Sequence, residues 1–305
     1  MGNAFTPRPG MMIGLDFTQQ YILKLGIIFL GIRLSFSDFV KFGSIAIPLI
    51  IICILGVLIL IKLLIKKVPI SSKMSYLIAI GTSVCGATAI VATAPVINAK
   101  KTEVAYAIAN ITLFGVIAMI IYPYFAEWYF ENDALNAGLF LGTSIHETSQ
   151  VAAAGLIYDQ QFNNPETLNV ATVTKLIRNT FLVILIPLFA FLYNRGEFKG
   201  QKYSIFNIFP YFVLGFIGMI ILRNFGDQFF LNENKDTYFW LTLIEYLKSL
   251  ATVFLTMAMA AVGISININE LKSMGYKPFI VGLIAAITVG IISLIYIETL
   301  SDFII

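Results

Sequence analysis

The hydrophobic residues of this chain are gathered in long runs that short polar links separate. About nine runs approach the roughly 20 apolar residues that a helix needs to cross a bilayer. They occupy residues 19–36, 43–65, 74–98, 103–124, 135–158, 169–193, 206–223, 240–264 and 276–300. The alternation of apolar and polar positions expected for the strands of a membrane barrel is missing from the sequence. The pattern therefore predicts an all-α, polytopic membrane helix bundle of about nine spans.

The polar links between these runs are too short to hold a second folded domain. We therefore expect residues 1–305 to form a single transmembrane domain. Residues 1–19 are polar and contain several prolines and glycines, which predicts a turn-prone start. The longest internal link, about 223–239, is rich in Asn and Asp, and we expect it to be an exposed loop.

The composition agrees with a membrane protein. Hydrophobic residues make up 58% of the chain, charged residues 12%, and the mean hydropathy is +0.86. A soluble domain of this length carries far more surface charge. The net charge of +3 is spread along the chain, so no basic patch for nucleic acid is expected. The spacing of the two cysteines, Cys53 and Cys85, and of the single histidine does not match a disulfide framework or a metal-binding motif. No cofactor is expected.

Two stretches of small and polar residues interrupt the apolar runs and open with nearly the same letters. The first, Gly81–Ala94, reads GTSVCGATAIVATA, and the second, Gly142–Gly155, reads GTSIHETSQVAAAG. Gly, Ser and Thr are poor residues for a helix interior, so we predict a break in each stretch, at 81–86 and 142–147. We expect the two breaks to face one another near the bilayer centre. The alternative is a close helix–helix contact, which small residues also mark in membranes.

The first stretch has the residues of an anion site. Its candidate residues are Gly81, Thr82, Ser83, Cys85 and Gly86. A break in the membrane frees backbone N–H and C=O groups, which need partners where water is absent. A helix that restarts near Gly86 would direct its N-terminal amides into a polar cavity, and such amides favour an anion.

The second stretch adds titratable groups. Its candidate residues are Thr143, Ser144, His146, Glu147 and Gln150, and His146 is the only histidine of the chain. Titratable residues deep in a membrane are costly and usually functional, so we expect His146 and Glu147 to carry a coupling proton. On a continuous helix, His146 and Gln150 would share one face. The alternative is a neutral, hydrogen-bonded His-Glu pair that only ties helices together.

Further polar residues interrupt other apolar runs. Lys175 and Arg178 lie one turn apart in TVTKLIRNTFLVILIPLFA. Both cations are candidates to face an anion, and the alternative is that both extend to the membrane interface. Asn110 and Glu245 are isolated in apolar runs, and we expect them to tie helices together.

A second internal similarity joins Leu30–Gly43 (LGIRLSFSDFVKFG) and Val262–Gly275 (VGISININELKSMG). If every run crosses the membrane once, the chain passes through these two places in opposite directions. Inverted repeats of this kind are typical of secondary transporters. Chance similarity between glycine-rich segments is the alternative.

The chain resembles the YeiH family (UPF0324) of bacterial inner-membrane proteins, whose members are often called sulfate exporters. The matching stretches are YILKLGIIFLGIRLSFSDF, GTSVCGATAIVATAPVI, TLFGVIAMIIYP, GTSIHETSQVAAAG, TKLIRN and LTMAMAAVGISININELKSMGYKP. They follow the family order across nearly the whole chain. The resemblance implies a multi-pass inner-membrane transporter related to the sodium/proton antiporter-like group, with two inverted repeats and broken central helices.

The same resemblance assigns a site role to residues 81–89 and to five single residues. These are His146, Glu147, Gln150, Lys175 and Arg178. The chain departs from the family at its start. Members of the family usually have about two further hydrophobic segments before the one that corresponds to the first run of this chain.

The predicted function is secondary transport of a small anion such as sulfate, a sulfonate or a related organic anion, coupled to H⁺. A Walker motif is missing from the sequence, so an ion gradient is the expected energy source. One alternative is a Na⁺/H⁺ antiporter, in which freed carbonyls and Glu147 hold the cation. Another is a membrane enzyme that uses His146 with Ser144 or Glu147. The expected partners are the anion, H⁺ or Na⁺, the lipid bilayer and, as an open alternative, a second copy in a homodimer.

Overall fold

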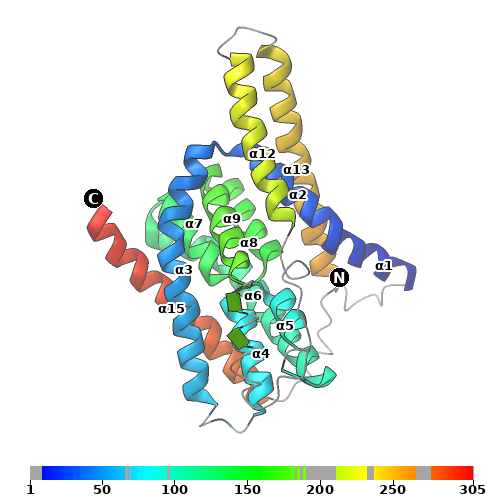
Figure 1. Ribbon diagram of the computed structural model, residues 1–305, viewed down its shortest axis with the longest axis vertical. Coiled ribbons are helices and arrows are strands. Elements are labelled where there is room, and N and C mark those ends of the chain that lie inside the picture. Colours follow the sequence, from blue (N-terminus) through cyan, green and yellow to red (C-terminus); the bar gives the residue numbers. More distant parts are fainter. Residues whose placement is uncertain are drawn as a thin grey trace. The chain divides into compact units, whose positions relative to one another are not determined.

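The computed structural model describes residues 9–65, 68, 70–94, 97–182, 184–185, 188–189, 211–231, 237–265 and 276–304. Every element in these ranges is a helix (Figure 1). The α-helices are α1 (Pro9–Phe17), α2 (Leu23–Leu30), α3 (Phe36–Leu64), α4 (Ser72–Ser83), α5 (Gly86–Thr93), α6 (Lys101–Phe130), α7 (Ala134–Ser144), α8 (Thr148–Phe162), α9 (Pro165–Thr180), α12 (Phe212–Gly226), α13 (Thr237–Ser265) and α15 (Tyr276–Ile304). Three short turns of other helix types are η1 (Thr18–Ile22), η2 (Gly31–Arg33) and η3 (Asp227–Leu231).

The long helices fit a membrane protein. In the described residues, 4 helices are long and apolar enough to cross a membrane, over Phe39–Leu64, Thr102–Phe130, Thr237–Ala258 and Lys277–Thr299. The all-α prediction is therefore confirmed for the described part of the chain, and the count of about nine spans stays a prediction. Two of the predicted runs, 74–98 and 135–158, are each divided between two helices.

Two predicted irregular segments are wrong. Residues 9–17 form α1, because Pro9 takes the first helical position, where its fixed φ and missing N–H are tolerated. The expected loop at about 223–239 is helical at 223–231, where α12 continues into η3, and again from Thr237. An ion pair between Arg223 and Asp227, four residues apart, supports the first of these turns. The rest of that loop lies outside the described residues.

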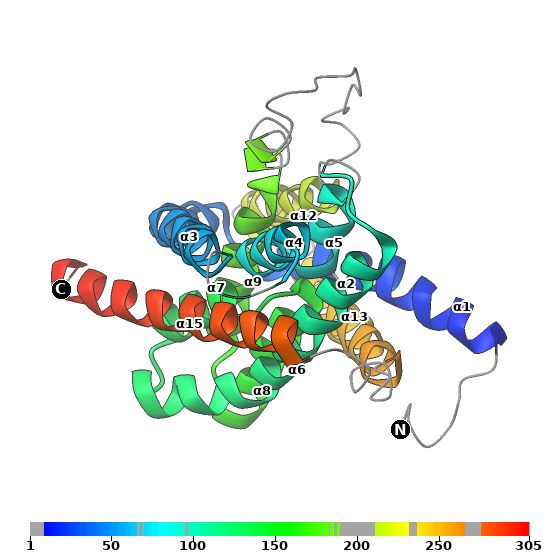
Figure 2. The same cartoon turned by 90° about the horizontal axis from the view of Figure 1, so that it is seen from below.

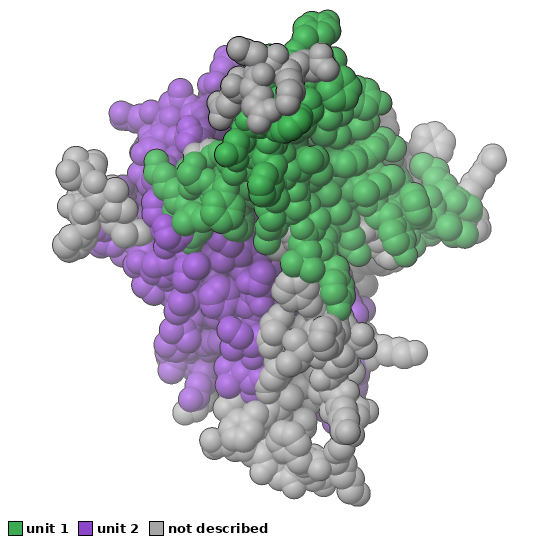
Figure 3. Space-filling model, turned by 45° about the horizontal axis from the view of Figure 1, so that its top comes forward, with its two compact units in different colours: residues 1–43, 210–268 green, residues 44–209, 269–305 purple. Residues whose placement is uncertain are grey.

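The chain divides into two compact units, coloured separately in Figure 3. Unit 1 comprises residues 1–43 and 210–268, and unit 2 comprises 44–209 and 269–305. The expectation of one transmembrane domain stays a prediction. The second copy of the Leu30–Gly43 similarity falls mostly on residues outside the described ranges.

In unit 1, α2 packs against both α12 and α13 (Figure 1). The adjoining turn η2 approaches α12 so closely that a Cβ at Gly31 would overlap the carbonyl oxygen of Phe216. Ile32, Trp240 and Ile244 are buried together beside this contact.

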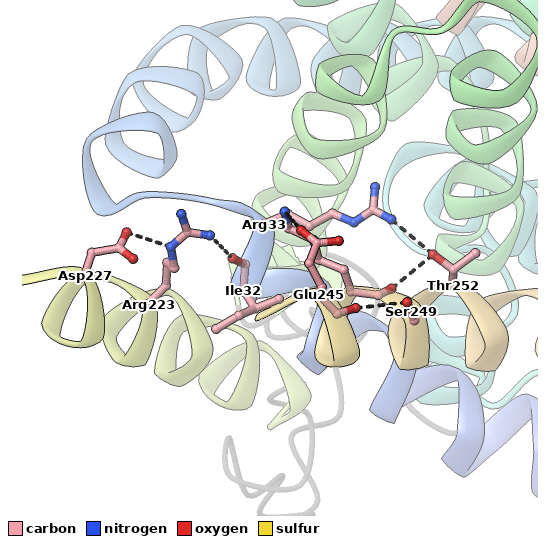
Figure 4. Close-up of polar contacts among 8 residues, drawn as sticks. Ile32, Arg33, Arg223, Asp227, Glu245, Ser249 and Thr252 are labelled. Carbon is pink, nitrogen blue, oxygen red and sulfur yellow. Dashed lines mark hydrogen bonds and ion pairs between the residues drawn. The ribbon is translucent and has the colours of Figure 1, made fainter. Parts of the chain in front are cut away.

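Polar contacts reinforce the same junction in unit 1 (Figure 4). Arg223 pairs with Asp227 at 2.6 Å and donates to the carbonyl of Ile32 at 3.2 Å. The indole N–H of Trp240 donates to Asp227 Oδ1 at 2.8 Å, so Asp227 links α13 to the end of α12. Glu245 does not tie helices together as predicted, because its side chain is 71% exposed and pairs with Lys248 on its own helix.

In unit 2, α7 and α8 both pack against α9, while α4 and α5 pack against α6. Helix α15 contacts α4, α6 and α7 (Figure 2). The buried Asn110 on α6 donates to the carbonyl of Pro278 on α15 at 2.7 Å, so its predicted role as a tie is confirmed. The polar helix α9 has most of its residues buried, which makes it a core element rather than a lipid-facing one.

We predict that Asp227→Ala destabilises the protein by about 1–3 kcal/mol, because the nearly buried indole N–H of Trp240 and the Arg223 guanidinium both lose an acceptor. Thermal unfolding in detergent, followed by the fluorescence of Trp240 in a Trp128→Phe background, measures the effect. The control is Asp16→Ala, which removes the same group from an exposed position in unit 1. Equal melting temperatures for the two variants would contradict the proposed link.

Candidate functional site

Both predicted interruptions are present, and each is shorter than predicted. Helix α4 continues to Ser83 and α5 begins at Gly86, so only Val84 and Cys85 are non-helical. Helix α7 continues to Ser144, and α8 begins at Thr148 after a non-helical segment, Ile145 to Glu147, whose first and last residues have extended backbone. The predicted restart near Gly86 is confirmed. Gly81 and Gly142, by contrast, are accommodated inside the preceding helices.

The two breaks face one another within unit 2. The Cys85 Sγ lies 3.7 Å from the Thr148 Oγ1, and the backbone N–H of Ala87 donates to Glu147 Oε1 at 3.4 Å. Gly86 has φ +45°, and a Cβ added there would overlap Glu147 Cγ. Glycine is therefore required at this position both by the backbone and by the opposite break. The depth of this contact in a bilayer stays a prediction.

Lys175 on α9 binds the backbone of both breaks. Its side chain is fully buried, and Nζ donates to the carbonyls of Val84 at 2.9 Å, Ile145 at 2.8 Å and His146 at 2.6 Å. Three acceptors match the three N–H groups of an ammonium, whereas a neutral amine has only two. The contacts of Lys175 therefore fit an ammonium group whose donors are all directed at carbonyl oxygens.

Arg178, one turn further along α9, makes a second bridge. Its Nε donates to the carbonyl of Ser83 at 2.6 Å, and its terminal nitrogens donate to the carbonyls of Thr82 and Thr143. Arg178 is also fully buried, so extension to the membrane interface, the alternative for both cations, is wrong. These two side chains thus bind six carbonyls at the ends of α4 and α7 and in the breaks that follow them.

Glu147 takes the opposite role at the helix starts. It is the N-cap residue of α8, and its side chain accepts from the backbone N–H of Gln150, whose side chain in turn accepts from Glu147 N at 3.2 Å. The same carboxylate accepts from Ala87 N at the start of α5. Gln150 also donates to the carbonyl of Thr112 on α6 at 3.3 Å. Glu147, rather than His146, therefore pairs with Gln150, because residues 145–147 are not helical and Glu147 is the N-cap of α8.

The place where the break between α4 and α5 meets the break between α7 and α8 is called the crossing below. Several buried polar atoms at the crossing have no hydrogen-bond partner among the described residues. They are Thr82 Oγ1, Ser83 Oγ, Ser144 Oγ and both ring nitrogens of His146, which is 1% exposed. Buried polar groups are nearly always paired, so these atoms are candidates for contact with a further polar partner. The alternative of a hydrogen-bonded His-Glu tie finds no support in this part of the structure.

Sequence reasoning missed Asn179. This residue is 2% exposed and donates to Thr148 Oγ1 at 3.0 Å, at the start of α8. It lies four residues after Lys175, and residues at this spacing share a helix face. That spacing was the signal available in the sequence. Thr143 was predicted as a site residue, and its hydroxyl pairs with Ser293 of α15 at 2.7 Å while its carbonyl receives Arg178.

The long apolar helices and the composition define a helical integral membrane protein. A family model described as conserved hypothetical protein 698 matches residues 1–282. A UPF0324 membrane protein of Streptococcus agalactiae is 35% identical over 292 residues, which is 96% of this chain and 84% of that protein. The chain belongs to the UPF0324 membrane protein family.

Two more relatives agree. A UPF0324 membrane protein of Fusobacterium nucleatum is 34% identical over 288 residues, covering 92% of this chain and 82% of its own length. The UPF0324 inner membrane protein YeiH of Escherichia coli is 32% identical over 278 residues, covering 89% of this chain and 74% of its own length. The predicted family is thus confirmed. No solved structure was found to match the chain.

We predict that Gly86→Ala destabilises the protein by about 1–3 kcal/mol, because a side chain is strained at positive φ and the added methyl overlaps Glu147. Thermal unfolding in detergent measures the loss. Gly218→Ala on α12 is the matched control, since nothing lies within 4 Å of its Cβ position. The control should be neutral or slightly stabilising, and an equal response of the two variants would refute the contact between the breaks.

Proposed function

We propose that this protein is a secondary transporter of a small anion, such as sulfate, a sulfonate or a related organic anion, and that transport is coupled to H⁺. The observation that carries the proposal is the charge balance at the crossing of α4/α5 with α7/α8. Lys175 and Arg178 bring two buried cations to the breaks, and Glu147 is the carboxylate that meets them there.

The net charge at the crossing is the sum of the three side-chain charges and the partial charges of the four helix ends that meet there. A helix C-terminus carries about half a negative charge, and an N-terminus about half a positive charge. The ends of α4 and α7 offset about one of the two cationic charges, and the starts of α5 and α8 offset the Glu147 carboxylate. An excess of about one positive charge remains, where each uncompensated buried charge costs several kcal/mol. A small bound anion would remove this cost.

The polar groups around the crossing suit an oxyanion. The unpaired hydroxyls of Thr82, Ser83 and Ser144 are donors, and neutral His146 has one N–H. The proposed substrate-binding set remains the predicted one, with Lys175 and Arg178 acting through charge rather than through open donors. Its members are Gly81, Thr82, Ser83, Cys85, Gly86, Thr143, Ser144, His146, Glu147, Gln150, Lys175 and Arg178. His146 and Glu147 are the proposed proton carriers.

The architecture is compatible with this role. Secondary transporters commonly place their sites at discontinuous helices that come from inverted repeats. Here two interrupted helix pairs, α4/α5 and α7/α8, open with the similar sequences GTSVC and GTSIH and meet at their breaks. The inverted repeat, the antiporter-like relationship and the span count are part of the proposal.

A Na⁺/H⁺ antiporter is the less favoured alternative. Such a site would use the backbone carbonyls freed at the breaks as ligands for the cation. In this structure those carbonyls, from residues 82–84 and from Thr143, Ile145 and His146, already accept hydrogen bonds from Lys175 and Arg178. Two tethered cations thus stand where a free cation would be bound.

An enzyme is also less favoured. A nucleophilic serine needs a base within hydrogen-bond reach. Neither Ser144 Oγ nor the ring nitrogens of His146 has a partner among the described residues, so they do not form such a pair here. The relatives reported above are named as membrane proteins, without an enzymatic activity.

The first test is a binding and transport experiment with purified protein. Sulfate, methanesulfonate and acetate are added as N-methylglucamine salts, and NaCl is tested separately. We expect at least one anion to raise the melting temperature, with about 2.7 kcal/mol of stabilisation at 100 times its Kd. We also expect proteoliposomes loaded with that anion to exchange it for the labelled form. Stabilisation by Na⁺ alone would favour the antiporter, and chemical conversion of the solute would favour the enzyme.

A second test concerns Arg178. Arg178→Gln should weaken anion affinity at least tenfold, because it removes one of two buried positive charges from the crossing. Arg178→Lys retains the charge but not the planar contacts with Ser83 and Thr143, so its loss should be smaller. Calorimetry with sulfate measures both affinities. Lys248→Gln, which removes a partly exposed cation on α13, should leave them unchanged. Equal affinity in all variants would place the anion elsewhere.

A further inference from the structure

The carboxylate of Glu147 is held by two helix starts that belong to different breaks. Glu147 is the N-cap residue of α8, and its carboxylate accepts from the backbone N–H of Gln150. The residue is therefore part of α8 through its backbone as well as through this hydrogen bond. Across the crossing it accepts from Ala87 N, in the first turn of α5. The residue at the N-cap of α5, Cys85, makes no side-chain capping bond. The start of α5 therefore relies on an anionic group supplied by the opposite break.

This second hold is the weaker one. The Ala87 N to Glu147 Oε1 distance is 3.4 Å, beyond the usual range of about 2.7–3.2 Å for such a bond. The contact to α8, by contrast, is part of a reciprocal capping box. Glu147 is partly buried, whereas its neighbours His146 and Gln150 are buried. The carboxylate is thus placed to leave α5 while it stays attached to α8.

The surroundings of the contact point to a ligand independently of the helix starts. Ser83 is fully buried, and Ser144 and His146 are each 1% exposed, yet Ser83 Oγ, Ser144 Oγ and the His146 ring nitrogens have no partner among the described residues. These groups flank the same two breaks. An oxyanion at the crossing would give them partners that Glu147 does not provide.

The charged and titratable groups near Glu147 are few. Lys175 of α9 is the nearby cation, Cys85 lies at the start of α5, and His146 precedes Glu147 in the chain. Helix α6 approaches through Thr112, whose carbonyl accepts from the Gln150 amide and whose side chain hydrogen-bonds to the Glu147 carboxylate, and Thr112 carries no charge. Protonation of Glu147 would therefore raise the positive excess at the crossing from about one charge to about two.

We infer that Glu147 is a tethered competitor of the transported anion. As a carboxylate it occupies the start of α5, and once protonated it releases those amides to the substrate. One proton then enters with each anion, and neutralisation of about two charges favours a dianion such as sulfate over a monoanion such as methanesulfonate. This inference rests on the proposed anion transport and goes further. It explains the proton coupling as a competition between the Glu147 carboxylate and the anion for the same backbone amides at the start of α5.

The competition predicts an unusual variant. Glu147→Gln removes the competing charge, so sulfate affinity at pH 8 should rise at least to the level that the wild type reaches at pH 6 and should vary little with pH. In the wild type, the linked uptake of one proton should strengthen sulfate binding by up to about tenfold per pH unit as the pH falls from 8 to 6. Glu147→Asp should keep the pH dependence, because it keeps a carboxylate.

The experiment is calorimetric titration of the purified protein with sulfate and with methanesulfonate at pH 6, 7 and 8. Repeating the wild-type titration in buffers of different ionisation enthalpy counts the protons taken up per sulfate, and the expected number is about one. Glu166→Gln is the matched control, since Glu166 lies in the first turn of α9 but is exposed. The control should behave as the wild type does.

Three results would overturn the inference while leaving anion transport intact. These are weaker sulfate binding by Glu147→Gln at every pH, a pH dependence parallel to that of the wild type, and sulfate binding by the wild type without proton uptake. Loss of the pH dependence in His146→Ala, with its retention in Glu147→Gln, would assign the proton to His146 instead. If neither anion binds to the wild type at any pH, the proposed function fails, and the inference fails with it. The proton count needs no variant, so it decides the matter even if Glu147→Gln does not fold.

Discussion

The structure of unit 2 depends on how the backbone groups at two helix breaks are paired inside a protein core. An unpaired backbone group costs several kcal/mol where water is absent, so an interrupted helix is tolerated only if something replaces its missing hydrogen bonds. Lys175 and Arg178 do this at the ends of α4 and α7, and Glu147 does it at the starts of α5 and α8. The side chains of Lys175 and Arg178 thus meet the negative C-terminal ends of helices, and the Glu147 carboxylate meets the positive N-terminal ends. Helix dipoles favour this arrangement of charges.

This pairing explains why the most polar helix of the core is also among the most buried. Helix α9 carries both cations and Asn179 on the turns that approach the breaks, and it packs against α7 and α8. Removing either cation would leave carbonyls of both breaks unpaired. The same charges that stabilise the crossing therefore also determine its positive electrostatic potential. A structural role for Lys175 is thus compatible with an effect of its charge on a nearby anion. The polar cluster of unit 1 differs in kind, since Arg223 and Asp227 balance each other and are partly exposed.

Much of this was accessible from the sequence, and the reasons for the misses are physical. The repeated GTS openings and the isolated His146–Glu147 pair predicted the two breaks and their contact, because small and polar residues in an apolar run need a structural explanation. The break limits were too wide, since Gly81 and Gly142 remain helical where neighbouring side chains pack against them. Composition could not show that Lys175 and Arg178 turn inward, because either cation could equally have reached the interface. Residues 223–231 were misassigned as loop, because the contacts of Arg223 with the carbonyl of Ile32 and of Asp227 with Trp240 are visible only in three dimensions.

The two breaks are similar in sequence but not equivalent in chemistry, and the difference bears on how they can move. The first break, Val84–Cys85, has no charged side chain of its own, whereas the second carries His146 and Glu147. The start of α5 consequently borrows its capping group from the second break, and both breaks share Lys175 as a hydrogen-bond donor. Any displacement of α4/α5 relative to α7/α8 must break the Ala87–Glu147 contact or carry Glu147 along with it. A proton on Glu147 would weaken the hydrogen bonds that this carboxylate accepts, at Ala87 and at Gln150, and would leave the cation bridges in place. The proposed proton site is therefore the one group whose protonation would alter how the two halves of the crossing are joined without breaking the bridges of Lys175 and Arg178.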